Sequence, residues 1–147
     1  MVTYEQIDKL PILYDFQYTL PRELVFSANK ISQGMFEQRQ AARCNLRGAF
    51  IHAKLEIQEL TDKFLSTVSY EPVEEPVGEV FCVGGLSALV FDPANFIPGV
   101  EKFVTDRFVK AGLLKDDNAS CIPSITICPM PYKKRDEYEF RQVFYKL

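Results

Sequence analysis

Residues 80–91 read VFCVGGLSALVF and form the most apolar stretch of this 147-residue chain. A short apolar run bounded by turn residues predicts a strand. The pair Gly84-Gly85 interrupts the run, so it is either a bulged strand or two strands that meet at a tight turn. The run ends abruptly at Asp92-Pro93, which is a common opening of a turn.

Two amphipathic helices are predicted on either side of this stretch. The longer lies within residues 27–65, where apolar residues recur in steps of four and three as one stripe: Leu46, Phe50, Ala53, Ile57, Leu60 and Phe64. The shorter covers residues 100–111 and ends at Gly112. Its predicted buried face holds Val100, Phe103, Val104, Phe108 and Ala111, whereas Glu101, Thr105 and Lys110 are expected to point away.

Three further strands are predicted at residues 12–20, 122–130 and 139–147. Residues 68–79 are rich in Pro and Glu and are expected to form a loop, and the charged residues 132–137 are expected to join the last two strands as a hairpin. The order of elements predicts an α+β (mixed α/β) fold. We expect one domain over residues 1–147, with a small mixed sheet of about four strands covered by one long and one shorter helix.

Composition excludes several classes of protein. The chain has 17 basic and 20 acidic residues, a balance that argues against a protein that coats DNA nonspecifically. It has four cysteines without C-x-x-C spacing and a single histidine, His52, which is poor support for a zinc site or a histidine-dependent triad. No apolar run approaches the length of a membrane span, and no secretory signal is visible, so a cytoplasmic protein is expected.

Carboxylates stand at both ends of the shorter helix. Asp92 precedes it, and the pair Asp116-Asp117 follows it. If the chain after the helix returns beside the end of the preceding strand, these groups converge and suit a hard divalent cation such as Mg²⁺. If the helix runs away from that strand end, they stay apart and are only turn residues. The spacing alone leaves both arrangements open.

A row of arginines, Arg39, Arg43 and Arg47, runs beside the apolar stripe of the longer helix, with Lys54 near the same direction. One interpretation is a solvated edge whose long side chains cover the margin of the core. The other is a ridge that contacts phosphates.

The segment Asp92-Pro-Ala-Asn95, followed by Lys102, Asp106, Lys110-Ala-Gly112 and Asp116-Asp117, resembles the signature of RusA-type Holliday junction resolvases, which are small dimeric endonucleases of phages and bacteria. The likeness covers the C-terminal half of the chain well. Upstream, residues 24–47 resemble the family's N-terminal segment that enters a basic helix.

The resemblance implies a Mg²⁺-dependent endodeoxyribonuclease, with Mn²⁺ as an alternative ion, that resolves Holliday junctions or other branched DNA. Metal-activated water would attack a phosphodiester. Asp92, Asp116 and Asp117 would be metal ligands, Lys102 would act beside Asp92 and Asp117 in catalysis, and Asn95 would brace the turn. A homodimer is implied, because a two-fold enzyme matches a two-fold junction.

Two departures from the family's pattern favour an alternative. Ala94 stands where many members have a second metal-ligand Asp, so one ligand is missing unless Asp116, Glu101 or Asp106 substitutes. Residues 88–91, ALVF, replace basic residues. DNA contacts would then fall to Arg39, Arg43 and Arg47 and to the triplet Lys133, Lys134 and Arg135. The alternative is a RusA-fold protein with lost or weakened cleavage that binds branched DNA or another protein.

Overall fold

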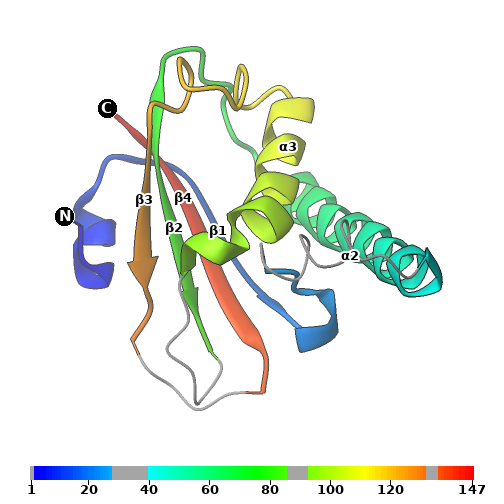
Figure 1. Ribbon diagram of the computed structural model, residues 1–147. Coiled ribbons are helices and arrows are strands. Elements are labelled where there is room, and N and C mark those ends of the chain that lie inside the picture. The colour runs from blue at the N-terminus through cyan, green and yellow to red at the C-terminus, as the bar shows by residue number, and fades with distance from the viewer. Residues whose placement is uncertain (1, 28–39, 86–92, 132–135) are drawn as a thin grey trace.

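The computed structural model describes residues 2–27, 40–85, 93–131 and 136–147, with side chains except at residues 40–47 and 93. The strands are β1 (Ile12–Leu20), β2 (Val77–Gly84), β3 (Ser124–Pro129) and β4 (Tyr138–Lys146). The long helices are α2 (Gln40–Thr67) and α3 (Lys102–Lys110). Shorter helical turns are η1 (Tyr4–Lys9), η2 (Arg22–Leu24), η3 (Pro93–Phe96) and the π-helical turn η4 (Ile97–Glu101). Figure 1 shows one twisted sheet with both long helices on the same side, which confirms the predicted α+β class.

The four strands lie in the order β1-β4-β2-β3. β4 pairs antiparallel with β1 and with β2, whereas β3 runs parallel to β2. The predicted hairpin between the last two strands is therefore wrong, because β2 separates β3 from β4. The physical reason is the helix between β2 and β3, which carries the chain back so that β3 can add in parallel.

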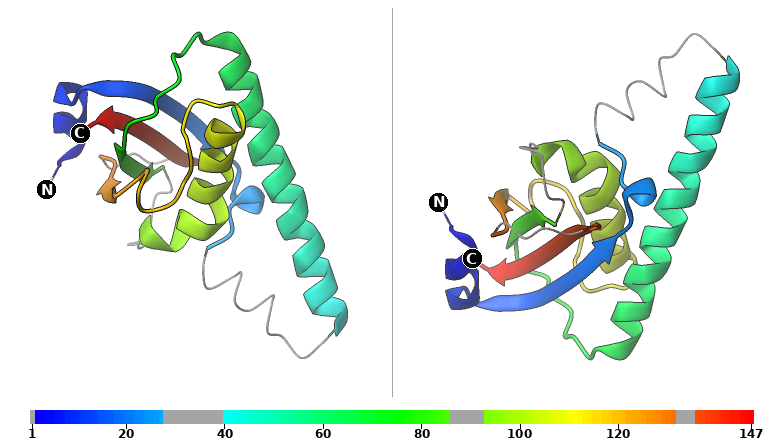
Figure 2. Two further views of the ribbon diagram at one scale, coloured as in Figure 1. Left: turned by 90° about the horizontal axis from the view of Figure 1, so that it is seen from above. Right: turned by 90° about the horizontal axis from the view of Figure 1, so that it is seen from below.

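One face of the sheet carries an aromatic core under the helices. Phe81 of β2 and Phe140 of β4 stack at 5.9 Å between ring centroids, and Phe108 of α3 packs on Phe144 of β4 at 5.2 Å. Figure 2 shows that α3 lies in the angle between the sheet and α2. Arg107 of α3 and Asp62 of α2 hold the two helices together through two hydrogen bonds of 2.8 Å.

The opposite face of the sheet is partly covered by η1. Ile7 of this turn is fully buried against Val80, Cys82, Cys128 and Val143. Cys82 and Cys128 are direct neighbours in the β2–β3 register, and both are buried as expected for small apolar side chains. The sheet therefore has apolar contacts on both faces.

The predicted strand at residues 12–20 is confirmed, and those at 122–130 and 139–147 are confirmed within two residues at each end. The prediction of a loop over residues 68–79 is wrong at its end, because β2 begins at Val77. Val77 pairs with Lys146 of β4, Glu79 lies between Ile125 of β3 and Phe144 of β4, and both residues are buried. Gly84 closes β2, and residues 86–92, the second half of the apolar run, lie outside the described residues.

The longer helix is confirmed over Gln40–Thr67, while residues 28–39 of the predicted range lie outside the described part. Ala53 and Ile57 of its predicted stripe are fully buried, and Phe50 and Phe64 pack against the core. Leu60, however, is 36 % exposed, and its neighbour Thr61 is buried in its place. Thr61 can lie there because its hydroxyl donates to the Ile57 carbonyl oxygen at 2.8 Å.

The shorter helix is confirmed over Lys102–Lys110, but Ala111, expected on its buried face, lies after the helix and is exposed. The expectation that Glu101 and Thr105 point away from the core is also wrong. Both are 1 % exposed. α3 packs against the sheet on one side and α2 on the other, so its buried arc is wider than a single stripe. After α3, Gly112 adopts a φ of +80°, the left-handed conformation that ends a helix. No helix among the described residues is long and apolar enough to cross a membrane.

Candidate functional site

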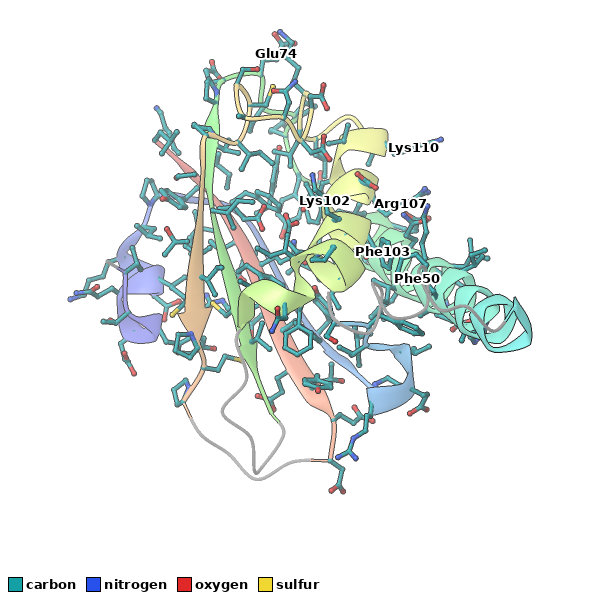
Figure 3. The ribbon with its side chains drawn as sticks, in the orientation of Figure 1. Phe50, Glu74, Lys102, Phe103, Arg107 and Lys110 are labelled. Atoms are coloured by element: carbon teal, nitrogen blue, oxygen red, sulfur yellow. The ribbon has the colours of Figure 1, made fainter. Side chains whose placement is uncertain are left out.

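The first turn of α3 and the loop that follows this helix meet through an ion pair. Lys102 Nζ donates a hydrogen bond to Asp117 Oδ2 at 3.2 Å. Phe103, the next residue of α3, packs instead against Phe50 of α2 at 5.4 Å between ring centroids (Figure 3). That packing fixes the rotation of the helix. The lysine and aspartate side chains remain 47 % and 29 % exposed, so the pair is accessible from solvent.

Each member of this pair keeps the other charged. Partial burial works to raise the pKa of Asp117, but the hydrogen bond and charge of Lys102 outweigh it, so this pKa lies below its ordinary value. Partial burial works to lower the pKa of Lys102, but Asp117 and the nearby acids Glu101 and Asp106 raise it above its ordinary value. Near neutral pH the site therefore holds a carboxylate and an ammonium group side by side.

Asp106 adds a second carboxyl group to the site. It lies one helical turn after Lys102 on α3, and its carboxyl is within hydrogen-bond reach of Asp117. Partial burial and the charge of Asp117 raise the pKa of Asp106, while Lys102 and Lys54 work to lower it. In the sequence, Asp106 stands within the motif and is one of three possible substitutes for the ligand missing at Ala94. Its spacing of four residues from Lys102 is the signal that places both on one side of the helix.

Asp116, predicted as a metal ligand, shapes the turn that presents Asp117. Its Oδ1 accepts the Asp117 backbone N–H at 2.7 Å, and its Oδ2 accepts the Asn118 side-chain amide at 3.0 Å. Asn118 Oδ1 in turn accepts the Ser120 and Cys121 backbone N–H groups at 3.0 and 3.2 Å. These bonds fix the direction in which Asp117 leaves the loop.

The remaining predicted site residues are placed only in part. Asn95 lies in η3 and is half-buried. The side chains of Arg43 and Arg47 are not described, although their backbone belongs to α2. Outside the described residues lie Asp92, Arg39, Lys133, Lys134 and Arg135. The convergence of Asp92 with Asp117 therefore stays a prediction.

Lys54 is the described member of the basic row on α2. Its Nζ lies 6.0 Å from the centre of the Phe103 ring, a distance that suits a cation–π contact. Its charge also acts on Asp106. The basic row of α2 therefore reaches the candidate site at Lys54.

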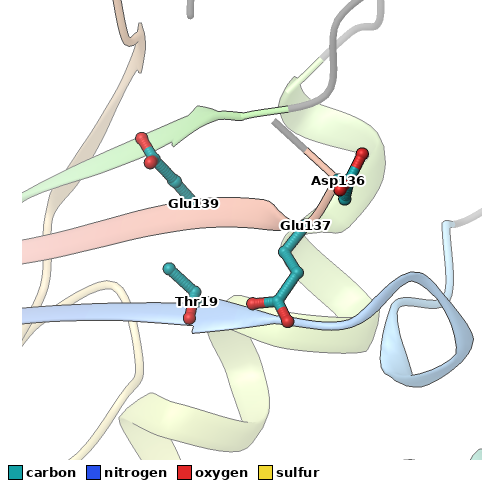
Figure 4. Close-up of a pocket in the computed structure, with 4 residues that line it drawn as sticks. All are labelled: Thr19, Asp136, Glu137 and Glu139. Carbon is teal, nitrogen blue, oxygen red and sulfur yellow. The ribbon is translucent and has the colours of Figure 1, made fainter. Parts of the chain in front are cut away.

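An acidic hollow of about 370 Å³ lies elsewhere, where β1 ends and β4 begins. Figure 4 shows its lining residues, which are Thr19, Asp136, Glu137 and Glu139. Three carboxylates in one hollow repel a phosphate chain. This hollow is therefore a poor surface for DNA.

The donor chemistry of the candidate site suits Mg²⁺. Asp106 and Asp117 supply carboxylate oxygens, and Mg²⁺ is commonly held by one or two carboxylates while it keeps several waters. Within residues 2–27, 40–85, 93–131 and 136–147, no group of three or more His, Cys, Asp or Glu side chains is gathered as a metal site. The sequence motif offers Asp92 as a further ligand.

The chain matches no family model and no curated protein. The geometry of this site and the sequence motif are therefore the grounds for a function.

Proposed function

We propose that this chain is a Mg²⁺-dependent, structure-specific endodeoxyribonuclease that cuts branched DNA, with a four-way junction as the substrate to test first. The observation that carries the proposal is the meeting of Lys102 with Asp117, from two separate segments, with Asp106 beside them. The likeness to RusA-type resolvases supports the same conclusion, since the three residues belong to that motif.

The carboxylates of Asp117, Asp106 and Asp92 would hold the cation. A bound Mg²⁺ supplies an activated water and neutralises charge on the attacked phosphate. Lys102 would stabilise negative charge on the phosphate or on the leaving oxygen, and the half-exposed position of its side chain beside Asp117 supports this role. Asp116 holds the turn that presents Asp117 and so orients that ligand.

DNA would reach the site along the basic row of α2. Lys54 brings positive charge to the edge of the site, and Arg39, Arg43 and Arg47 would extend it along the helix. The triplet Lys133, Lys134 and Arg135 is the second proposed contact. A homodimer would bring two such sites to the two strands that a junction resolvase must cut.

The test is incubation of the protein with an end-labelled four-way junction at low salt, with Mg²⁺, with Mn²⁺ and with a chelator. We expect paired nicks that need the metal. Asp117→Asn and Lys102→Ala should each slow nicking by about 10²–10³-fold, the usual effect of removing one stabilising group from an active site.

Matched controls are available on α2, where Lys63 and Glu59 form an exposed ion pair of 3.6 Å away from the site. Lys63→Ala and Glu59→Gln remove the same charges and should leave nicking unchanged. Nicking that survives in both Asp117→Asn and Lys102→Ala would contradict the proposal.

The second candidate is a branched-DNA or protein binding module that has lost cleavage. Ala94 favours it, because a side chain without oxygen stands in η3 where a further ligand would be expected. Tight junction binding without nicking in any metal would select this candidate. Absence of both binding and nicking at low salt would exclude both.

A further inference from the structure

Two carboxyl groups lie fully buried beneath α3. Glu79 is on β2 and Glu101 is the last residue of η4, and they are 0 % and 1 % exposed. Because side chains alternate along a strand, Glu79 shares its face with Phe81 and Val83, which belong to the core under the helices. Buried acids at this depth need a partner that compensates for the lost water.

A chain of hydrogen bonds leads to this pair and runs in one direction. The Tyr18 hydroxyl donates to Gln142 Oε1 at 2.6 Å, and Gln142 Nε2 donates to Thr105 Oγ1 at 3.3 Å. The Thr105 hydroxyl donates to Glu101 Oε1 at 2.8 Å. Gln142 Nε2 also reaches the Glu101 carbonyl oxygen at 3.5 Å. Each donor is thus directed toward its neighbour, and the chain ends on Glu101.

No donor from the described residues satisfies the oxygens that remain. Both Oε atoms of Glu79 and Oε2 of Glu101 are buried without a hydrogen-bond partner. The two carboxyl groups are nevertheless within hydrogen-bond reach of each other. Two ionised carboxylates in that position would repel in a medium of low dielectric constant. A proton on Glu79, donated to Glu101, removes the repulsion and supplies the missing donor.

The surroundings favour a proton over a metal ion. Mg²⁺ needs near-octahedral oxygen ligation with several waters, and both carboxyl groups are closed to solvent. Burial raises the pKa of Glu79 well above its ordinary value, and the nearby Glu101 raises it further. The charged and titratable groups that face the pair are Tyr18 from β1, Lys102 from α3 and Asp117 from the following loop. Gln142 of β4 and Thr105 of α3 are its neutral neighbours.

We propose that Glu79 and Glu101 share one proton, and that this pair ties β2 to the first turn of α3 so that Lys102 meets Asp117. Glu79 and Glu101 are then positioning residues, since they act through Lys102, the residue that follows Glu101 in the chain. The proton sharing is independent of the nuclease activity. The positioning of Lys102 for catalysis rests on the proposed function.

The shared proton has a defined effect on stability. In the unfolded chain Glu79 ionises near its ordinary pKa, whereas in the folded protein its raised pKa keeps the proton bound. The folded state therefore binds more protons, so the free energy of unfolding falls as the pH rises from the ordinary pKa of glutamate to the raised one. Glu79→Gln keeps a donor to Glu101 without a proton to lose. The melting temperature of this variant minus that of the wild type should thus increase with pH.

The first test uses the wild-type protein. Infrared spectra near pH 7 in D₂O should show the C=O stretch of a buried protonated carboxyl group, and Glu79→Gln should abolish it. Between about pH 5 and pH 8, the melting temperature of Glu79→Gln minus that of the wild type should rise by several degrees. The same difference for the exposed control Glu59→Gln should not change with pH. A wild type without the protonated band, or a variant whose relative stability does not change with pH, would overturn the proposal.

The second test follows Lys102. Glu79→Leu leaves Glu101 charged and buried, whereas Glu79→Gln preserves the donor. We expect the NMR signals of the Lys102 side chain to move in Glu79→Leu and to stay in Glu79→Gln, with junction nicking slowed by about 10–100-fold only in the former. Lys102 signals unchanged in Glu79→Leu would reject the positioning role. A wild type that shows the band but never nicks DNA would reject the nuclease alone.

Discussion

Arg141 of β4 donates two hydrogen bonds to the carboxylate of Asp15 on β1, from Nε to Oδ1 at 3.0 Å and from Nη2 to Oδ2 at 2.7 Å. The arginine side chain is only 6 % exposed. Its Nη2 also donates to Asp8 at 2.9 Å, and its guanidinium lies 5.6 Å from the centre of the Tyr4 ring. One buried cation thus joins the first strand and η1 to the last strand.

Asp15→Asn should lower the free energy of unfolding by about 1.5–3 kcal/mol, because it removes a charged acceptor from a buried arginine. Asp8→Asn is the matched control. Asp8 is 76 % exposed, so its loss should cost less than about 1 kcal/mol. Urea unfolding of both variants measures the difference. Equal losses would mean that Asp15 is not the principal partner of Arg141.

Ala94→Asp should raise Mg²⁺ affinity by about ten-fold, because a further carboxylate adds a charged ligand. Ala94 lies in η3, directly before Asn95. Calorimetric titration with Mg²⁺ measures the affinity, and Ala94→Asn is the uncharged control of the same shape. Unchanged affinity together with an unchanged nicking rate would show that position 94 does not reach the cation.

Asp136→Asn combined with Glu137→Gln should tighten junction binding several-fold at low salt. These residues line the acidic hollow and directly follow the proposed Lys133–Arg135 contact in the sequence, and their charges repel phosphates. The gain should shrink as salt is added, since the ions screen exposed charges. Fluorescence anisotropy at several salt concentrations tests this, with Glu59→Gln as the control. A gain that does not depend on salt would point to a structural effect instead.

Gly85→Ala should destabilise the fold by more than about 1 kcal/mol. Gly85 has a φ of +104°, and a Cβ there would collide with the Glu137 carbonyl oxygen and lie 2.7 Å from the Glu139 backbone nitrogen. Gly48 of α2 is the contrasting position, because a Cβ there meets nothing within 4 Å. Gly48→Ala should stabilise the protein by about 0.5–1 kcal/mol. Thermal unfolding of both variants checks the opposite signs, and a stable Gly85→Ala would contradict the close approach.

Local patterns were sufficient to predict most elements of this fold. The strand at residues 12–20, the stripe through Ala53 and Ile57, and the glycine that ends α3 all follow from contacts within a few residues. The predicted loop over residues 68–79 was wrong at Val77. The prolines before Val77 are typical of a loop, and the partners of the strand that begins there lie far away in the chain.

The order of strands could not be predicted in the same way. Two strands joined by a short charged loop favour a hairpin, but β2 lies between β3 and β4. Pairing across the sheet joins residues far apart, such as Ile12 and Tyr145, and no local pattern records it. The succession of strand, helix and strand over β2, α3 and β3 was the usable signal, since parallel neighbours need such a crossover.

The candidate site was predicted in part. Lys102 and Asp117 were named from the motif and lie together in the structure. Asp106 was named only as one of three substitutes for a missing ligand, although its spacing of one helical turn from Lys102 already places both on one side of the helix. Glu101 was misplaced for a general reason. Hydrophobic periodicity assigns every glutamate to the solvent, whereas this one is buried beside Glu79.

The position of β4 in the middle of the sheet governs when the protein can assemble. Ribosomes deliver β4 after the other three strands, yet both β1 and β2 pair through it. Until residues 138–146 emerge, the early strands present open edges that invite pairing with other chains. Nascent chains should therefore remain vulnerable to proteases and to aggregation until β4 has emerged, and acquire protection in one cooperative step when this central strand inserts.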